Sequence, residues 1–258
     1  MTSLPTIAVD VGNARIKLGL FCSNHADPLP EPETTLSLDG RRPQWRDLES
    51  WLKEADRPQT HWWIGSVNRP ATTRLLDWIR QQRPADPLTL LAAGDLPIAV
   101  RLKRPDMVGI DRLLDAVAAD HLRTNGRPAV VVDVGTAITV DLVSADGAFC
   151  GGAIMPGIEM AARAMHEFTD LLPVIAMSEL AEPPPAAGDS TAPAMRSGLY
   201  WGAVGGIREL IAQLSKHAGA PAEVFLTGGA GAPVAELLGP YARHVPHLTL
   251  AGIALTAR

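Results

Sequence analysis

Residues 129–143 constrain the fold more than any other part of the chain. They form two runs of β-branched and aliphatic residues on either side of Gly135 and Thr136, a pattern typical of two strands joined by a tight turn. Asp133 lies within the first run, where a buried carboxylate is costly unless it binds a cation or accepts hydrogen bonds. We therefore expect Asp133 to have a specific partner.

The beginning of the chain repeats this pattern. Residues 7–21 again read as strand, glycine turn and strand, with Asp10 at the position of Asp133 and Gly12 at that of Gly135. Similarity between segments about half a chain apart indicates two related halves rather than an array of short repeats, although chance also produces matches of this length.

Composition excludes several classes of partner. The net charge is −5 and basic residues form no run, so we expect no nucleic-acid partner. The two cysteines, Cys22 and Cys150, lack metal-ligand spacing, which favours a reducing compartment. No stretch approaches the ~18 uninterrupted apolar residues that span a bilayer, so we expect no membrane partner and a cytoplasmic protein.

The rest of the chain alternates strand and helix patterns, which predicts an α/β fold. Strands are expected at 61–67, 88–91, 98–100, 150–157 and 224–227, and helices at 45–54, 70–82, 158–168, 191–216, from 106 and from 233. Residues 22–46 read as an irregular excursion and 179–193 as a surface loop. Four glycines in 191–216 predict close packing of that helix. We place the boundary between the halves so that they span residues 1–117 and 118–258.

Three of the predicted strands end in glycine turns, at 10–13, 133–136 and 227–231. Backbone N–H groups around such turns recognise phosphates without steric bulk. None has a Walker or Rossmann sequence. One such turn alone is more often an ordinary hairpin, but three favour a nucleotide site in a cleft between two similar halves.

Four segments in order, 10–17, 109–112, 133–141 and 151–157, resemble the motifs of type III pantothenate kinases, and the resemblance runs from Ile7 to about Gly231. That family belongs to the sugar kinase, heat-shock chaperone and actin superfamily. The resemblance therefore implies two ribonuclease-H-like halves with an ATP cleft between them. It also implies a homodimeric kinase that uses ATP to convert pantothenate to 4'-phosphopantothenate, the first step of coenzyme A biosynthesis.

The resemblance further implies roles for single residues. Lys17 would be a cationic contact of ATP, and Asp10 a ligand of magnesium or water. Asp111 would accept the proton of the pantothenate hydroxyl, and Asp133 would bind potassium or ammonium. The implied ATP contacts are Asp10, Val11, Gly12, Asn13, Ala14, Arg15, Ile16, Lys17 and Thr136, and the implied pantothenate contacts are Gly109, Ile110, Asp111, Arg112 and Thr191.

These roles suit phosphoryl transfer, which depends mainly on alignment and on neutralising charge at the γ-phosphate. Arg112 could hold the substrate carboxylate or the transferred phosphoryl group with its planar guanidinium. From sequence alone, Asp111 and Arg112 could equally be a helix-capping acid and its ion-pair partner.

Two residues depart from the family pattern. Ala14 stands where the family usually has threonine, and Leu102 where a tyrosine commonly contacts pantothenate. The departures leave open a catalytically inactive nucleotide-binding regulatory or accessory protein of the same fold. A kinase for another small hydroxylated substrate is a third reading.

Overall fold

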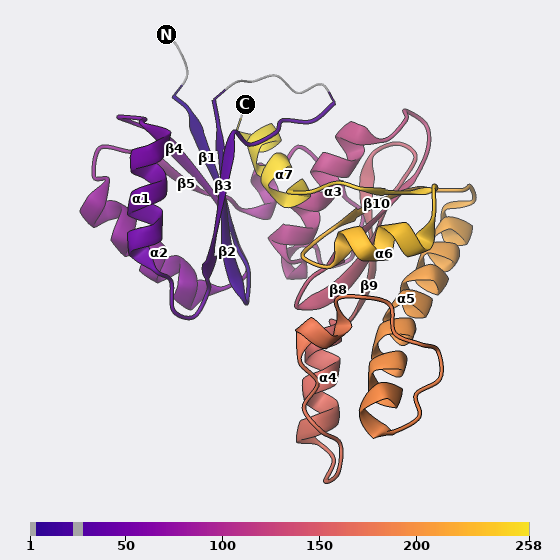
Figure 1. Ribbon diagram of the computed structural model, residues 1–258. Coiled ribbons are helices and arrows are strands. Elements are labelled where there is room, and N and C mark those ends of the chain that lie inside the picture. Colours follow the sequence, from indigo (N-terminus) through magenta and orange to yellow (C-terminus); the bar gives the residue numbers. More distant parts are fainter. Residues whose placement is uncertain (1–3, 23–27, 258) are drawn as a thin grey trace. The chain divides into compact units, whose positions relative to one another are not determined.

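The computed structural model describes residues 4–22 and 28–257, and the chain divides into two compact units (Figure 1). Unit 1 comprises Met1–Leu122 and His247–Arg258, and unit 2 comprises Arg123–Pro246. The division therefore follows Leu122 rather than residue 117. It also groups the last residues of the chain with unit 1.

Unit 1 is built on a five-stranded sheet of order β3-β2-β1-β4-β5. The strand β1 pairs antiparallel with β2 and parallel with β4. The elements of this unit are β1 (Thr6–Val11), β2 (Arg15–Phe21), β3 (Thr34–Asp39), α1 (Trp45–Ala55), β4 (His61–Ser66), α2 (Arg69–Gln82), β5 (Leu88–Leu90), β6 (Ala99–Val100), α3 (Ile110–Leu122) and α7 (Leu248–Thr256), with short 3-10 helices at Ala93–Asp95 and Pro105–Met107.

Helices cover the sheet of unit 1 on both faces. The helices α1 and α2 lie together beside the strands (Figure 1), where Leu48 and Leu75 join the apolar side chains of β1, β2 and β4 in one buried cluster. The helix α7 contacts β1, β2 and β4, and it packs on α3. A methyl group on Gly252 of α7 would lie only 2.1 Å from the carbonyl oxygen of Leu114, so glycine allows the two helices to approach closely.

Unit 2 repeats the strand order of unit 1. Its own five strands are ordered β11-β10-β7-β8-β9, with β7 antiparallel to β8 and parallel to β10. The α/β class and the two related halves are thereby confirmed. The elements are β7 (Ala129–Val134), β8 (Ala137–Val143), β9 (Ala148–Pro156), α4 (Ile158–Glu167), α5 (Thr191–Ala218), β10 (Glu223–Thr227), α6 (Gly231–Leu238) and β11 (Ala242–His244), with a 3-10 helix at Met177–Leu180.

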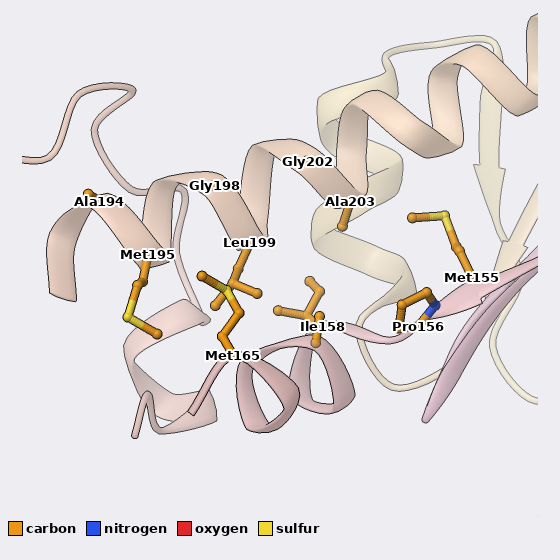
Figure 2. A pocket seen from close by; sticks show the side chains of 11 residues that line it. Met155, Pro156, Ile158, Met165, Ala194, Met195, Gly198, Leu199, Gly202 and Ala203 are labelled. Carbon is orange, nitrogen blue, oxygen red and sulfur yellow. The ribbon is translucent and has the colours of Figure 1, made fainter. Parts of the chain in front are cut away.

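The glycines of α5 do not pack as the sequence predicts. A methyl group on Gly198, Gly202 or Gly205 would meet no described atom within 4 Å outside the helix itself. Gly198 and Gly202 instead line an apolar groove of about 400 Å³ between α4 and α5, into which Met165 and Leu199 project (Figure 2). Within the described chain, the predicted close packing is therefore not found at these three positions, because glycine spacing does not reveal what covers that face.

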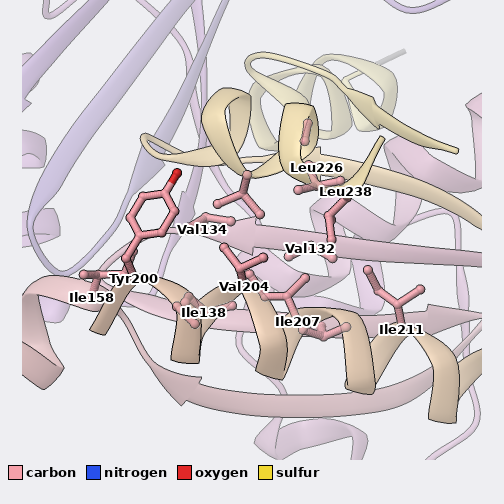
Figure 3. Packing of buried hydrophobic residues seen from close by; sticks show 14 of the residues in the cluster. Val132, Val134, Ile138, Ile158, Tyr200, Val204, Ile207, Ile211, Leu226 and Leu238 are labelled. Atoms are coloured by element: carbon pink, nitrogen blue, oxygen red, sulfur yellow. The ribbon is translucent and has the colours of Figure 1, made fainter. Parts of the chain in front are cut away.

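The core of unit 2 forms between its sheet and the helices α5 and α6. Figure 3 shows Val204 and Ile207 of α5 beside Val132 and Val134 of β7, and Leu238 of α6 beside Leu226 of β10. Alternate residues of β7 enter this core, as expected for a strand with one covered face. The neighbouring position Asp133 therefore lies on the opposite face of β7, near its carboxyl end.

The sequence prediction of an irregular excursion over 22–46 is wrong for 34–39, where β3 pairs antiparallel with β2. Residues 23–27 of that excursion lie outside the described residues. The strand β11 and the helix α7 were also not predicted. Across the described parts of the chain, no helix combines the length and the apolar character needed to cross a membrane.

A buried carboxylate fixes the start of β4 to the loop that follows α2. One oxygen of Asp86 accepts hydrogen bonds from Arg83 Nε at 2.8 Å, Thr60 Oγ1 at 2.9 Å and Trp62 Nε1 at 3.0 Å. Burial raises the pKa of the Asp86 carboxyl, but these hydrogen bonds together outweigh it, and the pKa lies below its ordinary value.

We expect Asp86→Asn to lower the free energy of unfolding by about 3 kcal/mol at pH 7, because Arg83 would keep a buried charge without its counter-ion. The folded pKa of Asp86 is depressed, so its carboxylate stabilises the protein above the unfolded pKa of about 3.9. This contribution is lost as the pH falls through the folded pKa, and the difference between wild type and variant should shrink there. Urea unfolding from pH 7 to pH 3 measures it.

The matched control is Asp77→Asn. Asp77 and Arg80 form the same kind of pair within one helical turn at 3.7 Å, but more than half of each side chain is exposed. This variant should change the free energy of unfolding by less than about 0.5 kcal/mol. Equal effects of the two variants would contradict the role given to burial of Asp86.

Candidate active site

The first glycine turn joins β1 to β2. Gly12 N donates to Arg15 O at 2.9 Å, which closes the turn, and Asn13, Ala14 and Arg15 are exposed at its tip. Asp10 is paired in register with Lys17, and Lys17 Nζ lies 3.7 Å from Asp10 Oδ2. The turn thus presents exposed backbone beside one cation and one mostly buried carboxylate.

Two of the residues implied as ATP contacts are core residues. Val11 and Ile16 are fully buried and belong to the cluster under α1 and α2. Their side chains are therefore turned into the core of unit 1, and only their backbone remains for a ligand.

Asp111 lies in the first turn of α3, and its Oδ1 accepts a hydrogen bond from Arg112 N at 2.9 Å. A methyl group on Gly109 would lie 2.5 Å from this Oδ1 and 3.6 Å from Val67 Cγ1. The missing side chain of Gly109 therefore makes room for the carboxylate. Ile110 is buried and packs towards Gly65 of β4.

The structure brings the first turn and Asp111 to the same edge of the sheet. Val67 follows β4, its N–H donates to Val11 O at 3.1 Å, and its side chain lies beside Gly109. Because β1 and β4 are parallel, their carboxyl ends meet at one edge. Sequence reasoning did not single out Val67, since a valine at the end of a strand carries no functional signal of its own.

In unit 2 the second and third glycine turns lie against each other. Asp133 of β7 is in register with Thr227 of β10, and Gly228 follows with φ of +92°. A methyl group on Gly228 would lie 2.3 Å from Asp133 Oδ1 and 2.6 Å from Val134 O. The two oxygens therefore lie close to one point beside the Gly228 backbone.

The strand β9 ends on the same turn. Gly157 N donates to Thr136 O at 3.1 Å, and a methyl group on Gly157 would lie 2.4 Å from the carbonyl oxygens of both Gly135 and Thr136. Thr136 itself is exposed. The motif at 151–157 therefore supports the turn at 133–136 through backbone contact.

Thr191 is the exposed first residue of α5. The loop before it is fixed to α5, because Trp201 Nε1 donates to Pro184 O at 3.0 Å and Ser197 Oγ donates to Ala186 O at 2.7 Å. Leu102, which departs from the family pattern, is half-buried in unit 1.

The carboxylates of Asp10 and Asp133 and the carbonyl of Val134 carry oxygen atoms, which suit hard cations. Within the described residues, no group of three or more His, Cys, Asp and Glu side chains could hold a metal ion. Magnesium in kinases is bound largely by substrate phosphates with one or two carboxylates, a requirement that Asp10 can meet.

We expect Gly228→Ala to destabilise the protein by about 3 kcal/mol and to displace Asp133, because φ of +92° disfavours a side chain and the methyl group would strike a carboxylate and the backbone. The adjacent Gly229 is the control, since a methyl group there would meet no described atom within 4 Å. Thermal unfolding compares the two variants. Equal stability of both would show that the approach of Gly228 to Asp133 is not needed.

Known proteins resemble this chain at two levels. Two solved structures share its fold: a candidate N-acetylmannosamine kinase of Listeria monocytogenes, 15% identical with a TM-score of 0.50, and a candidate 2-dehydro-3-deoxygalactonokinase of Sinorhizobium meliloti, 18% identical with a TM-score of 0.52. Each match covers 98% of both chains.

Comparison with relatives in sequence identifies the family more specifically than comparison of folds. The type III pantothenate kinase of Acidiphilium cryptum is 40% identical over 75% of this chain and 71% of its own length. That of Parafrankia sp. is 32% identical over 96% of both chains, and one from Dehalococcoides mccartyi is 37% identical over 96% and 95%. A sequence model of the type III pantothenate kinase family matches residues 6–213. The first two glycine turns and Asp111 lie within the residues that the family model matches, and the chain belongs to the type III pantothenate kinase family.

Proposed function

We propose that this enzyme transfers the γ-phosphoryl group of ATP to the primary hydroxyl of pantothenate, giving 4'-phosphopantothenate for coenzyme A biosynthesis. The observation that carries the proposal is the position of Asp111, whose carboxylate lies beside Gly109 and Val67 at the edge of the sheet where the first glycine turn also lies. An acid and an exposed backbone turn at one edge are the parts that an alcohol kinase needs.

The first turn and Thr136 are the proposed ATP contacts. Residues 12–15 would present backbone groups to the phosphates, Lys17 would add positive charge, and Asp10 would bind magnesium or its water. Neutralised in this way, the γ-phosphoryl group accepts an incoming oxygen more readily.

Asp111 is the proposed proton acceptor. The hydroxyl oxygen of pantothenate forms a bond to the γ-phosphorus as the bond to the β–γ bridging oxygen breaks; the hydroxyl proton passes to Asp111, and ADP leaves. In a loose transition state the proton leaves late, so the main task of Asp111 is to orient the hydroxyl. Arg112, the next residue of α3, would bind the substrate carboxylate or the moving phosphoryl group.

We expect Asp111→Asn to lower kcat at least ~100-fold, because a neutral amide orients the hydroxyl less strongly than a carboxylate and cannot accept its proton. Gly109→Ala should lower kcat about tenfold while leaving the melting temperature nearly unchanged, because the new methyl group moves only the Asp111 side chain. Purified protein with ATP, magnesium, potassium and pantothenate, followed by mass spectrometry of phosphopantothenate, measures both. Absence of product from the wild type, with potassium or ammonium, would refute the proposed reaction; full activity of Asp111→Asn would refute the base.

We also propose that Asp133 binds a monovalent cation, potassium or ammonium. The support is the oxygen pair formed by its carboxylate and Val134 O beside Gly228. Activity in potassium chloride should exceed activity in sodium chloride at the same ionic strength, because the proposed site takes the larger ion. Asp133→Asn should lose this preference. Equal rates in the two salts for the wild type would contradict the role.

The apolar groove between α4 and α5 supports a homodimer, in which a second copy would cover it (Figure 2). Gly202→Arg places a charge in the groove and should shift the molecular mass measured by light scattering from dimer to monomer. Gly205→Arg is the control, because Gly205 is an open glycine of the same helix but does not line the groove. A monomeric wild type, or equal masses of the two variants, would contradict this interface.

We place the reaction in the cytoplasm, where ATP is available and thiols stay reduced. Cys22 and Cys150 are both free thiols, in keeping with that location.

A further inference from the structure

One helix holds the first glycine turn from outside. Asn68 is the N-cap residue of α2, and its Oδ1 accepts a hydrogen bond from Ala71 N at 3.2 Å. The other side-chain atom, Nδ2, donates to Gly12 O at 3.2 Å. The same amide group therefore caps the helix and binds the turn.

A second residue of α2 contacts the turn indirectly, through Gly40. Arg74 donates from one η nitrogen to Gly40 O at 2.7 Å, and Gly40 N donates to Ala14 O at 2.8 Å. A methyl group on Gly40 would lie 3.1 Å from the carbonyl carbon and oxygen of Ala14, so glycine permits this close approach.

The hydrogen bond to Gly12 O also fixes the direction of the neighbouring N–H group. The C=O of Gly12 and the N–H of Asn13 belong to one planar trans peptide and point in opposite directions. The bond from Asn68 to Gly12 O therefore directs Asn13 N–H away from α2, at the exposed tip of the turn. It also keeps the partial negative charge of that carbonyl away from an incoming anion.

We infer that Asn68 and Arg74 are positioning residues for ATP, acting through the carbonyl groups of Gly12 and Ala14. The inference rests on the proposed assignment of this turn to the ATP phosphates. The helix α2, which lies outside the family motifs, thereby gains a role in ATP binding. This role would matter more beside Ala14, which has no hydroxyl to hold the turn or the ligand.

The decisive variant is Asn68→Ser. Serine is a good N-cap residue and neutral, but it cannot cap α2 and also reach Gly12. The KM for ATP should rise about fivefold, because the Asn13 N–H is no longer held in one direction, while the KM for pantothenate stays nearly constant. The melting temperature should fall no more than in a control variant that loses one hydrogen bond of the same kind. Gln59→Ser is the control, because Gln59 Nε2 also donates to a backbone carbonyl of unit 1, Ala85 O at 2.6 Å, away from the turn.

Arg74→Met tests the second contact, from Arg74 to the turn. We expect a smaller rise in the KM for ATP than for Asn68→Ser, because Arg74 acts on the turn through Gly40. Arg80→Met removes the same charge from an exposed position on the same helix and should leave the KM unchanged. The variant that combines Asn68→Ser and Arg74→Met should raise the KM for ATP more than either single variant does, since both residues hold one turn.

Lys17→Met separates the possible failures. If it leaves the KM for ATP unchanged, the turn is not the ATP site, and both the assignment and this inference are overturned. If it raises that KM while Asn68→Ser and Arg74→Met do not, the assignment stands and the inference alone is overturned. A fall in melting temperature with equal changes in both KM values would show a merely structural role and would also overturn it.

Discussion

In each unit, a glycine lies directly against a carboxylate. A methyl group on Gly109 in unit 1 would lie 2.5 Å from Asp111 Oδ1, and one on Gly228 in unit 2 would lie 2.3 Å from Asp133 Oδ1. At such distances any side chain would push the acid away or move the backbone. Each acid is therefore held against bare backbone, which fixes its place without adding a group that could compete with substrate.

The sequence predicted the first two strand–turn–strand segments because their pattern is local. The acid and glycine of each turn are neighbours in the chain, and the two related turns occupy equivalent strands of two sheets with one strand order. Contacts between distant segments were not predictable in this way. Asn68 could be recognised as a helix cap before Pro70, but its bond to Gly12 depends on the parallel pairing of β1 and β4.

The sequence did not predict β3 and α7, and each omission has a physical reason. The strand β3 lies at the edge of its sheet with only Leu38 buried, so backbone pairing with β2 forms it and no apolar pattern marks it. The helix α7 is buried on nearly all sides, so its apolar residues show no helical periodicity. For the glycines of α5, the sequence showed the helical spacing but could not show what covers that face of the helix.

The return of the chain to unit 1 has a consequence for synthesis. The buried hydrogen bond from Thr249 Oγ1 to Asp115 joins residues 134 positions apart, and α7 covers strands made long before it. During synthesis, α3 alone covers part of the face of unit 1 opposite α1 and α2, and the rest of that face stays uncovered until α7 emerges. A chain that stops short of residue 248 would hold every motif residue and yet lack the helix that completes the unit carrying Asp111.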